Sequence, residues 1–220
     1  MSEADFDWKA WRREARRAQI EARRALAEDD RRDRNHAIDD WLREGFIALG
    51  GMSVGFCWPF AAEPEPRFAV RRWRAAGSRA ALPVVVAPRT PLEFREWWPG
   101  APMEPGVYDI PHPVGTEVVL PQAALVPVNG FCPEGYRLGY GGGYFDRTLA
   151  ALETRPVCIG LGYEIARMKT IYPQPHDVPF DFFVTEAGIA ARINGRLEAV
   201  DPAGADARVR AIQAERGIRN

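Results

Sequence analysis

Several features that would assign this sequence quickly are scarce or missing. It has three cysteines and three histidines in 220 residues. Cys57, Cys132 and Cys158 form no CxxC pair and cannot all pair with one another, so we expect free thiols and a reducing compartment. The scattered histidines form no zinc-binding pattern. The sequence therefore predicts neither a disulfide scaffold nor a zinc site.

Long apolar runs and a large net charge are missing as well. The longest apolar stretches, such as LPVVVA, are far shorter than the roughly 20 residues that cross a bilayer. The first residues, MSEADFDWKAW, are acidic where a secretory signal would be basic and then apolar. With 29 Lys and Arg against 30 Asp and Glu, the net charge of −1 gives no general attraction to nucleic acid or membranes. We expect a cytoplasmic monomer or small homo-oligomer with neither kind of partner.

The sequence instead contains a helical start followed by alternating strands and helices. Residues 8–27 place apolar and small side chains at helical spacing, and a second helix is expected from about Asp30 to Leu49. Beyond residue 50, five short apolar runs are typical of buried strands: MSVGFCW, LPVVVA, AALVPV, PVCIGL and DFFVTE. This alternation predicts an α/β fold with an open, mostly parallel sheet in a Rossmann-like three-layer arrangement, preceded by a basic N-terminal helical arm.

The expected organisation is one domain over residues 1–220. It comprises N-terminal helices over 1–49, an α/β core over 50–200, and a C-terminal tail over 201–220 that is either an exposed helix or frayed. The proline-rich interval 94–117 has no clean period, and we expect a long ordered loop there, as functional loops often are.

The stretch YRLGYGGGYFDR at 136–147 contains four glycines within five positions, ahead of a helix-forming segment. Glycine weakens a fold unless the backbone must turn tightly or approach a ligand closely. One explanation is a tight turn, and the other is a loop whose N–H groups hold an anion at a helix start. The stretch is neither a Walker A loop, since GxxxxGK followed by Ser or Thr is missing, nor a dinucleotide fingerprint, since Tyr144 stands at the third glycine.

The order of an apolar strand, a turn and RLGYGGGYFDR resembles the 5-formyltetrahydrofolate cyclo-ligase family. The resemblance extends to WPFAAEPEPR, LPVVV, LEFREWWPG, YDIPHP and YPQPHDVPFDFFVTEAG, and loosely to the basic N-terminal helix. It implies an enzyme that uses ATP and Mg²⁺ to convert 5-formyltetrahydrofolate to 5,10-methenyltetrahydrofolate, with release of ADP and phosphate. The implied chemistry is attack of the formyl oxygen on the γ-phosphorus, ring closure by the neighbouring folate nitrogen, and departure of phosphate.

Phosphoryl transfer of this kind needs positioning and charge neutralisation more than a protein nucleophile. We assign ATP binding to the glycine loop and Arg137, whose guanidinium can donate to phosphate oxygens. The full expected ATP set is Lys9, Arg13, Arg137, Gly139, Tyr140, Gly141, Gly142, Gly143, Tyr144 and Asp146, with Arg137 and Tyr144 as catalytic residues. Lys9 and Arg13 rest on the family's use of a Lys and an Arg from this helix. They share one helix face with Arg16, and the register leaves Arg12 and Arg17 equally available.

For Mg²⁺, which prefers hard oxygen ligands, the resemblance implies Asp146 and Asp177. Asp146 could instead cap the following helix, and Asp181 replaces Asp177 if the alignment slips. His176 is expected to orient Asp177 or to lie in the turn.

The folate needs an aromatic surface and a carboxylate. The expected set is Trp58, Glu63, Trp98, Tyr144 and Phe145, with Glu65 and Trp97 as neighbouring alternatives and Trp58 also compatible with the core.

One residue departs from the family pattern. Cys132 stands where the family commonly has Asp, which removes a carboxylate that could brace the loop or hold substrate, and Glu134 is a potential substitute. Alternative functions are therefore a substrate-shifted enzyme and a non-catalytic nucleotide- or folate-binding paralogue. RNA binding by the arginine-rich helix is the least favoured alternative, because no stacking aromatic platform is interleaved with its basic residues.

Overall fold

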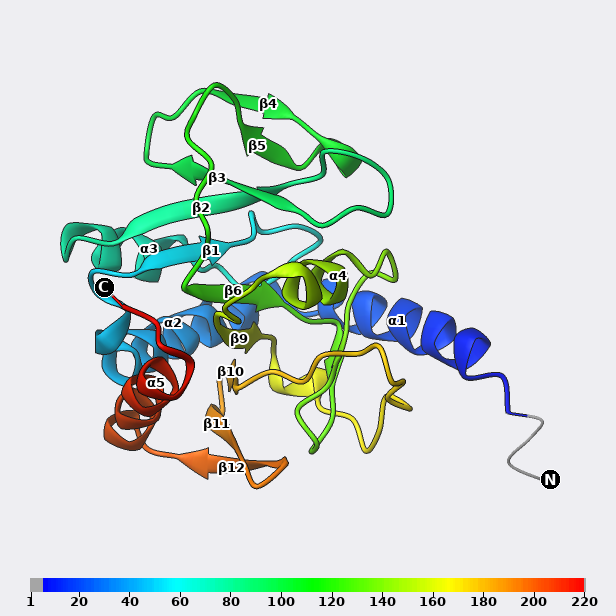
Figure 1. Ribbon diagram of the computed structural model, residues 1–220. Coiled ribbons are helices and arrows are strands. Elements are labelled where there is room, and N and C mark those ends of the chain that lie inside the picture. The colour runs from blue at the N-terminus through cyan, green and yellow to red at the C-terminus, as the bar shows by residue number, and fades with distance from the viewer. Residues whose placement is uncertain (1–5, 220) are drawn as a thin grey trace.

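The computed structural model describes residues 6–219, and a mixed eight-stranded sheet forms its centre (Figure 1). The helices are α1 (Trp8–Arg24), α2 (Glu28–Gly45), α3 (Arg67–Ala75), α4 (Tyr144–Ala151) and α5 (Pro202–Arg216). Short 3-10 turns lie at Ile47–Leu49, Val107–Asp109 and Glu164–Ala166. The strands of the main sheet are β1 (Ser53–Phe56), β2 (Arg79–Val84), β3 (Glu93–Trp97), β6 (Ala123–Pro127), β9 (Val157–Leu161), β10 (Phe182–Thr185), β11 (Gly188–Ile193) and β12 (Arg196–Val200).

The strand order is β12-β11-β10-β9-β6-β1-β2-β3. The five central strands from β10 to β2 are parallel, while β3, β11 and β12 pair antiparallel at the two sides. The chain runs from β1 to β2 on one side and returns to β6 on the other, so the order reverses beside β1. The carboxyl ends of strands at such a reversal are the usual place for a ligand crevice in α/β sheets.

Side chains alternate between two apolar layers, as the period of a strand requires. One face, including Phe56, Leu125 and Ile159, packs against α2, α3 and α5, and the other face, including Val126 and Cys158, packs with Leu149 of α4. The predicted α/β fold with an open, mostly parallel sheet between helices is confirmed, as are the five apolar strands and the helix after the glycine loop, α4. No helix within residues 6–219 is long and apolar enough to cross a membrane.

Three regions differ from the sequence prediction. The proline-rich interval expected to be a loop contains β3 and a small hairpin of β4 (Met103–Pro105) and β5 (Pro111–Pro113), which lies above the sheet in Figure 1. The second helix, expected to reach Leu49, ends at Gly45 and is followed by a separate 3-10 turn; its Ile38 and Leu42 are buried against the sheet. Helix α5 is packed rather than frayed, because Val209 and Ile212 are buried in the same cluster.

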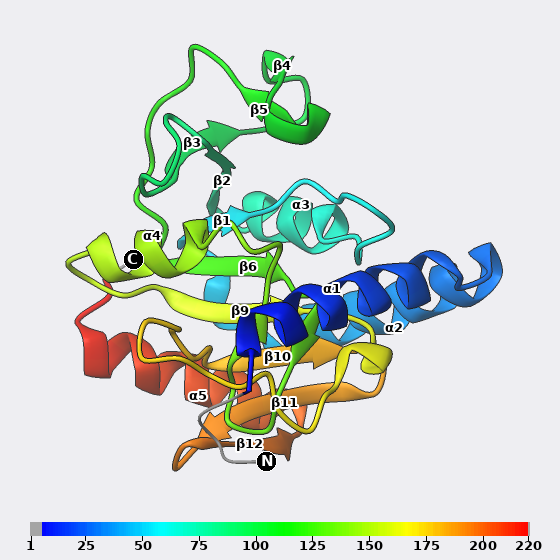
Figure 2. The ribbon, with the colours of Figure 1, turned by 90° about the vertical axis from the view of Figure 1, so that its right-hand side faces the viewer.

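Helix α1 is attached to the rest of the chain in an unusual way. Its N-cap is Asp7, whose side chain accepts from the Ala10 N–H, and its buried residues are two arginines, Arg12 and Arg23. Figure 2 shows α1 passing across one side of the sheet, with α2 behind it. Charged groups are buried only when they are paired, so the partners of these arginines mark where α1 is fixed.

Candidate active site

A cavity of about 630 Å³ lies where the strand order reverses. Its floor comes from the residues that end β2 and β6 or follow β1, including Val84, Pro127 and Cys57, and its walls come from α1, the glycine loop and the β4–β5 hairpin. This volume is within the range of small-molecule sites. The cavity lining includes most of the site residues expected from the sequence, namely Lys9, Arg13, Trp58, Glu63, Arg137, Gly139, Tyr140, Gly141, Gly142, Gly143, Tyr144, Phe145, Asp146 and Asp177.

The glycine loop follows a short hairpin, β7 (Gly130–Phe131) with β8 (Arg137–Leu138), and leads into α4. Gly141 and Gly143 have φ values of 94° and 63°, a region that side chains rarely adopt. Gly143 is the N-cap of α4 and has no side chain to cap it, so Asp146 in the first turn is not the cap. The loop therefore presents backbone to the cavity at a helix N-terminus, which favours an anion.

Arg137, which is buried, and Asp146, which is half-buried, form one pair beside the loop. Arg137 Nη2 lies 3.1 Å from Asp146 Oδ2, and Asp146 Oδ1 accepts from the Val178 N–H at 3.1 Å. Arg137 Nη1 also donates to the Val178 carbonyl at 3.1 Å, and the guanidinium stacks over Phe180. These contacts fix both side chains at the start of α4.

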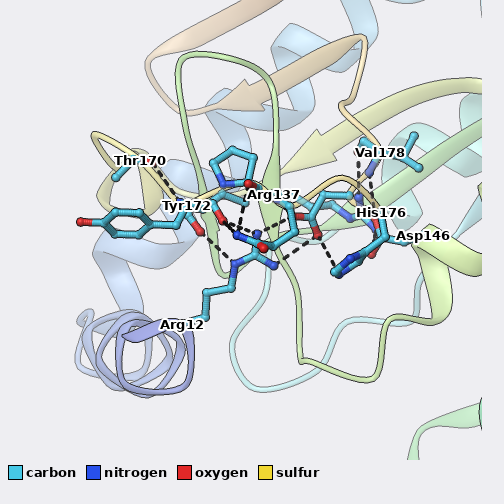
Figure 3. A network of polar contacts seen from close by, with 11 residues as sticks. Arg12, Arg137, Asp146, Thr170, Tyr172, His176 and Val178 are labelled. Atoms are coloured by element: carbon cyan, nitrogen blue, oxygen red, sulfur yellow. Dashed lines mark hydrogen bonds and ion pairs between the residues drawn. The ribbon is translucent and has the colours of Figure 1, made fainter. Parts of the chain in front are cut away.

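Arg12 and Asp177 form the second pair. Arg12 donates to both carboxylate oxygens of Asp177 and to the carbonyls of Ile171 and Tyr172. Burial alone would raise the pKa of Asp177, but hydrogen bonds from Arg12 and the Gln174 N–H outweigh burial and lower that pKa. Figure 3 shows Arg12, Arg137, Asp146 and His176 drawn together in this network. The His176 side chain is exposed at 68 % and lies 3.9 Å from Asp177.

Helix α1 contributes more to the cavity than the sequence analysis assigned to it. Lys9 and Arg13 are exposed and line the cavity, together with Arg12 and Arg16. Arg16 Nε donates to the Gly139 carbonyl at 2.6 Å, and burial together with the neighbouring Arg12 lowers the pKa of Arg16. Four cationic side chains of one helix thus line the cavity, a distribution that suits a polyphosphate.

Glu63 occupies the other part of the cavity, in the turn after β1. It is 6 % exposed, and its oxygens accept from the Phe60 N–H at 2.9 Å and the Tyr140 hydroxyl at 2.6 Å. Burial raises the pKa of Glu63 against the opposing effects of Tyr140 and Arg23. Glu65, the alternative, pairs with Arg67 and does not line the cavity among the described residues.

Aromatic rings surround this part of the cavity. Trp58 lines it and packs edge-on against the buried Trp97, while Phe145 lies between the cavity and Phe94. Trp98 is exposed at 37 % and is not among the cavity residues. Tyr108 is a further lining aromatic that the sequence analysis missed, because the hairpin that carries it was expected to be a loop.

Two residues with open roles lie away from the cavity. Cys132 is fully buried in a cluster with Leu138 and Ile171 and does not line the cavity. The departure from the family pattern at this position therefore does not alter the cavity wall. Asp181 pairs with Arg216 of α5, which removes the reason to prefer it over Asp177 at the site.

The two candidate carboxylates fit a magnesium ion that is shared with a nucleotide. Among residues 6–219 no three His, Cys, Asp or Glu side chains gather as a metal site. Mg²⁺ is commonly held by only one or two carboxylates, with substrate phosphates and waters completing its shell. Asp146 and Asp177 both line the cavity, and each is paired with an arginine. The donor set therefore suits an ion that arrives with phosphates.

Comparison with known proteins agrees with this geometry. Residues 8–186 match the model of the 5-formyltetrahydrofolate cyclo-ligase family. The chain is 28% identical over 185 residues to the 5-formyltetrahydrofolate cyclo-ligase of Mycolicibacterium smegmatis, covering 80% of this chain and 94% of the relative. It is 33% identical over 100 residues to that of Haemophilus influenzae, covering 42% of this chain and 54% of the relative.

Two solved structures share the fold. The 5,10-methenyltetrahydrofolate synthetase of Aquifex aeolicus matches with a TM-score of 0.72 at 24% identity, covering 84% of this chain and 94% of that one. The enzyme of the same name from Mycoplasma pneumoniae matches with a TM-score of 0.66 at 22% identity, over 82% and 99% of the two chains. With the family model matching from α1 to the end of β10, the chain belongs to the 5-formyltetrahydrofolate cyclo-ligase family.

Proposed function

We propose that the protein converts 5-formyltetrahydrofolate and ATP to 5,10-methenyltetrahydrofolate, ADP and phosphate. The formyl oxygen attacks the γ-phosphorus and displaces ADP, the neighbouring folate nitrogen bonds to the formyl carbon, and that carbon's bond to the phosphorylated oxygen breaks to release phosphate. The observation that carries the proposal is one cavity that joins a glycine loop and α1 cations to a buried carboxylate and aromatic walls. The proposal treats residues 1–220 as one domain.

The nucleotide lies against the glycine loop in this proposal. The N–H groups of 139–143 face the phosphates, and Lys9 and Arg13, which are exposed at the cavity, reach them from α1. Arg137 is held beside the loop by Asp146 and the Val178 carbonyl, so it can donate to the transferring phosphoryl group without first being ordered. Tyr144 lines the cavity at the start of α4 and orients the reacting groups.

Magnesium would be held by Asp146 and Asp177, where it would neutralise phosphate charge and polarise the transferring group. Both carboxylates are paired with arginines, and phosphate oxygens are alternative acceptors for those arginines. The remaining N–H groups of Arg12 and Arg137 can donate to phosphate, while each carboxylate, with about four lone-pair sites, stays available as a ligand.

The folate occupies the Glu63 part of the cavity. A pterin edge has N–H donors, and Glu63 supplies an acceptor that is shielded from water. Trp58 and Phe145 offer flat apolar surface to the ring system. Closing the two substrates into a half-buried cavity keeps water away from the activated intermediate.

The assay for this function is the absorbance of 5,10-methenyltetrahydrofolate with purified protein, ATP, Mg²⁺ and 5-formyltetrahydrofolate. We expect product only when ATP is present, with one phosphate released per product. A substrate-shifted or non-catalytic paralogue remains the second candidate, because Cys132 departs from the family pattern. Binding of both substrates without product would favour the non-catalytic form, and ATP hydrolysis with a different formamide would favour the substrate-shifted one.

A further inference from the structure

A chain of polar contacts joins the two halves of the cavity. Tyr140 lies in the glycine loop, and its hydroxyl donates to Glu63 Oε1 at 2.6 Å across 77 positions of sequence. Arg23, at the end of α1, donates to the same hydroxyl at 2.9 Å and to Asn129 Oδ1 at 3.1 Å. A single tyrosine of the nucleotide loop thus contacts the carboxylate that we assign to the folate.

The direction of these hydrogen bonds is fixed by chemistry. A guanidinium can only donate, so the Tyr140 oxygen must accept from Arg23 and its own proton must go to Glu63. A phenylalanine at this position could do neither. The hydroxyl is therefore the group of residue 140 that connects Arg23 to Glu63 by hydrogen bonds.

Arg23 also supports the turn that carries Glu63. Its Nε donates to the Ala61 carbonyl at 3.0 Å, and Ala61 and Ala62 both have positive φ values, 49° and 61°. Such conformations cost free energy and persist only where the surroundings hold them. Arg23 is 4 % exposed and Glu63 6 % exposed, so these two ends of the network are shielded from water, while Tyr140 between them is 42 % exposed.

Few other side chains hold the glycine loop. Gly139 and Gly141 flank Tyr140, and glycine gives the backbone more freedom than any other residue. The other side-chain bond from α1 to this segment is that of Arg16 to the Gly139 carbonyl. Arg147 holds the far end of the loop through the Gly142 carbonyl, whereas the tyrosine hydroxyl makes the hydrogen bond that links the loop to the folate half of the cavity.

We propose that Tyr140 is a positioning residue that, with Arg23 and Glu63, couples the two substrate sites so that each substrate strengthens binding of the other. A folate that engages Glu63 orders the carboxylate, and with it the tyrosine and the loop. The nucleotide then binds a loop that is already ordered and loses less conformational entropy. By linkage the same factor applies to folate binding in the presence of nucleotide. This inference rests on the proposed function for the identity of the two ligands.

The test is calorimetric titration with Mg²⁺ and a non-hydrolysable ATP analogue, with and without saturating 5-formyltetrahydrofolate. In the wild-type protein we expect the folate to tighten analogue binding about tenfold or more, within the range of known couplings. Tyr140→Phe should lose this gain, so that the analogue binds equally with and without the folate. Tyr172→Phe is the matched control, since it removes a hydroxyl from a tyrosine outside the cavity lining, and it should keep the wild-type gain.

A Tyr140→Phe protein that keeps the wild-type gain overturns the inference, as does a wild-type protein without any gain. Titration with the folate alone tests the proposed function separately. If 5-formyltetrahydrofolate does not bind the wild-type protein, the proposed function fails. The analogue titration without folate then decides on the positioning role. Tyr140→Phe must bind the analogue severalfold more weakly than Tyr172→Phe, and equal affinities would overturn that role.

Discussion

Gly141 lies against Arg16 of helix α1. A Cβ built there would lie 3.1 Å from the Arg16 Cζ, at a φ of 94° that side chains rarely adopt. A Cβ on Gly139 would meet nothing within 4 Å, and its φ is not in the positive region. Two glycines of the same loop are therefore present for different reasons.

We predict that Gly141→Ala lowers the free energy of unfolding by about 1–3 kcal/mol, the usual cost of a strained backbone conformation. It should also weaken binding of the ATP analogue by about tenfold, because Arg16 must move away from the loop. Chemical denaturation and calorimetry measure the two effects. Gly139→Ala, used as the stability control, should change the free energy of unfolding by less than about 0.5 kcal/mol. Equal losses in both variants would contradict this account of the loop.

Asp146 tests the metal assignment. Asp146→Asn keeps an oxygen that can accept from the Val178 N–H but loses the charge that faces Arg137. We expect turnover in the methenyltetrahydrofolate assay to fall by about a hundredfold or more, because a metal ligand contributes several kcal/mol to phosphoryl transfer.

The control for this variant is Asp109→Asn, in a hairpin residue outside the cavity lining, which should leave turnover near normal. Near-normal turnover in Asp146→Asn, with an unchanged magnesium requirement, would move the metal site to Asp177.

At the scale of the elements, the strands that could be predicted from the sequence are those buried on both faces of the sheet. Strands β1, β6, β9 and β10 lie between two layers, so each is a continuous apolar run. Strand β3 reads EFREW and β12 reads RLEAV, because edge strands are half exposed and carry charges. Nothing in their composition distinguishes them from a loop. The hairpin β4–β5 was missed for the same reason, and Tyr108 with it.

The site shows the same division. The glycine loop was predictable, because four close glycines have few structural explanations. The arginines of α1 were not, because Arg12, Arg13, Arg16 and Arg17 cover several faces of one helix. The choice among them depends on the Ile171 and Tyr172 carbonyls, which meet Arg12 only after folding. The role of Arg23 depends in the same way on Tyr140 and Asn129, more than a hundred positions away.

Helix α5 is joined to the sheet by an ion pair that can be tested. Arg216 donates to both oxygens of Asp181, with Nη1 at 3.0 Å from Oδ2, and to the Pro156 carbonyl. We predict that Arg216→Ala lowers the free energy of unfolding by about 2 kcal/mol, since it leaves a largely buried carboxylate with weaker partners. Arg208→Ala, which breaks the more exposed pair with Glu215 on the same helix, should cost less than about 0.5 kcal/mol. Denaturant titration of both variants decides, and similar losses would show that the buried pair adds nothing.

For the whole molecule, burial of the Glu63 carboxylate lowers the free energy of unfolding when that group is ionised. Its pKa is raised in the folded protein, chiefly because burial disfavours the carboxylate. A folded state with the higher pKa binds more protons than the unfolded chain, so the free energy of unfolding decreases as the pH rises through that window. A ligand whose donors reach the carboxylate would relieve part of this cost, which explains how an expensive buried charge serves binding.

The last prediction isolates this contribution with Glu63→Gln. The amide cannot ionise, so relative to the wild-type protein the variant should gain stability as the pH rises from about 4.5, the ordinary value for glutamate, through the raised pKa. Each tenfold change in proton affinity is worth about 1.4 kcal/mol. Glu63 also raises the pKa values of Cys57 and Tyr140, but both groups titrate above this range of pH, so the difference between the denaturation curves reports the Glu63 carboxyl. Glu65→Gln, two residues away and paired with Arg67, should show no such rise. A difference for Glu63→Gln that stays constant from pH 4 to pH 8 would mean that the tyrosine and arginine contacts fully offset burial. Ionisation of Glu63 would then have no effect on stability, and a ligand that binds it would have no burial cost to relieve.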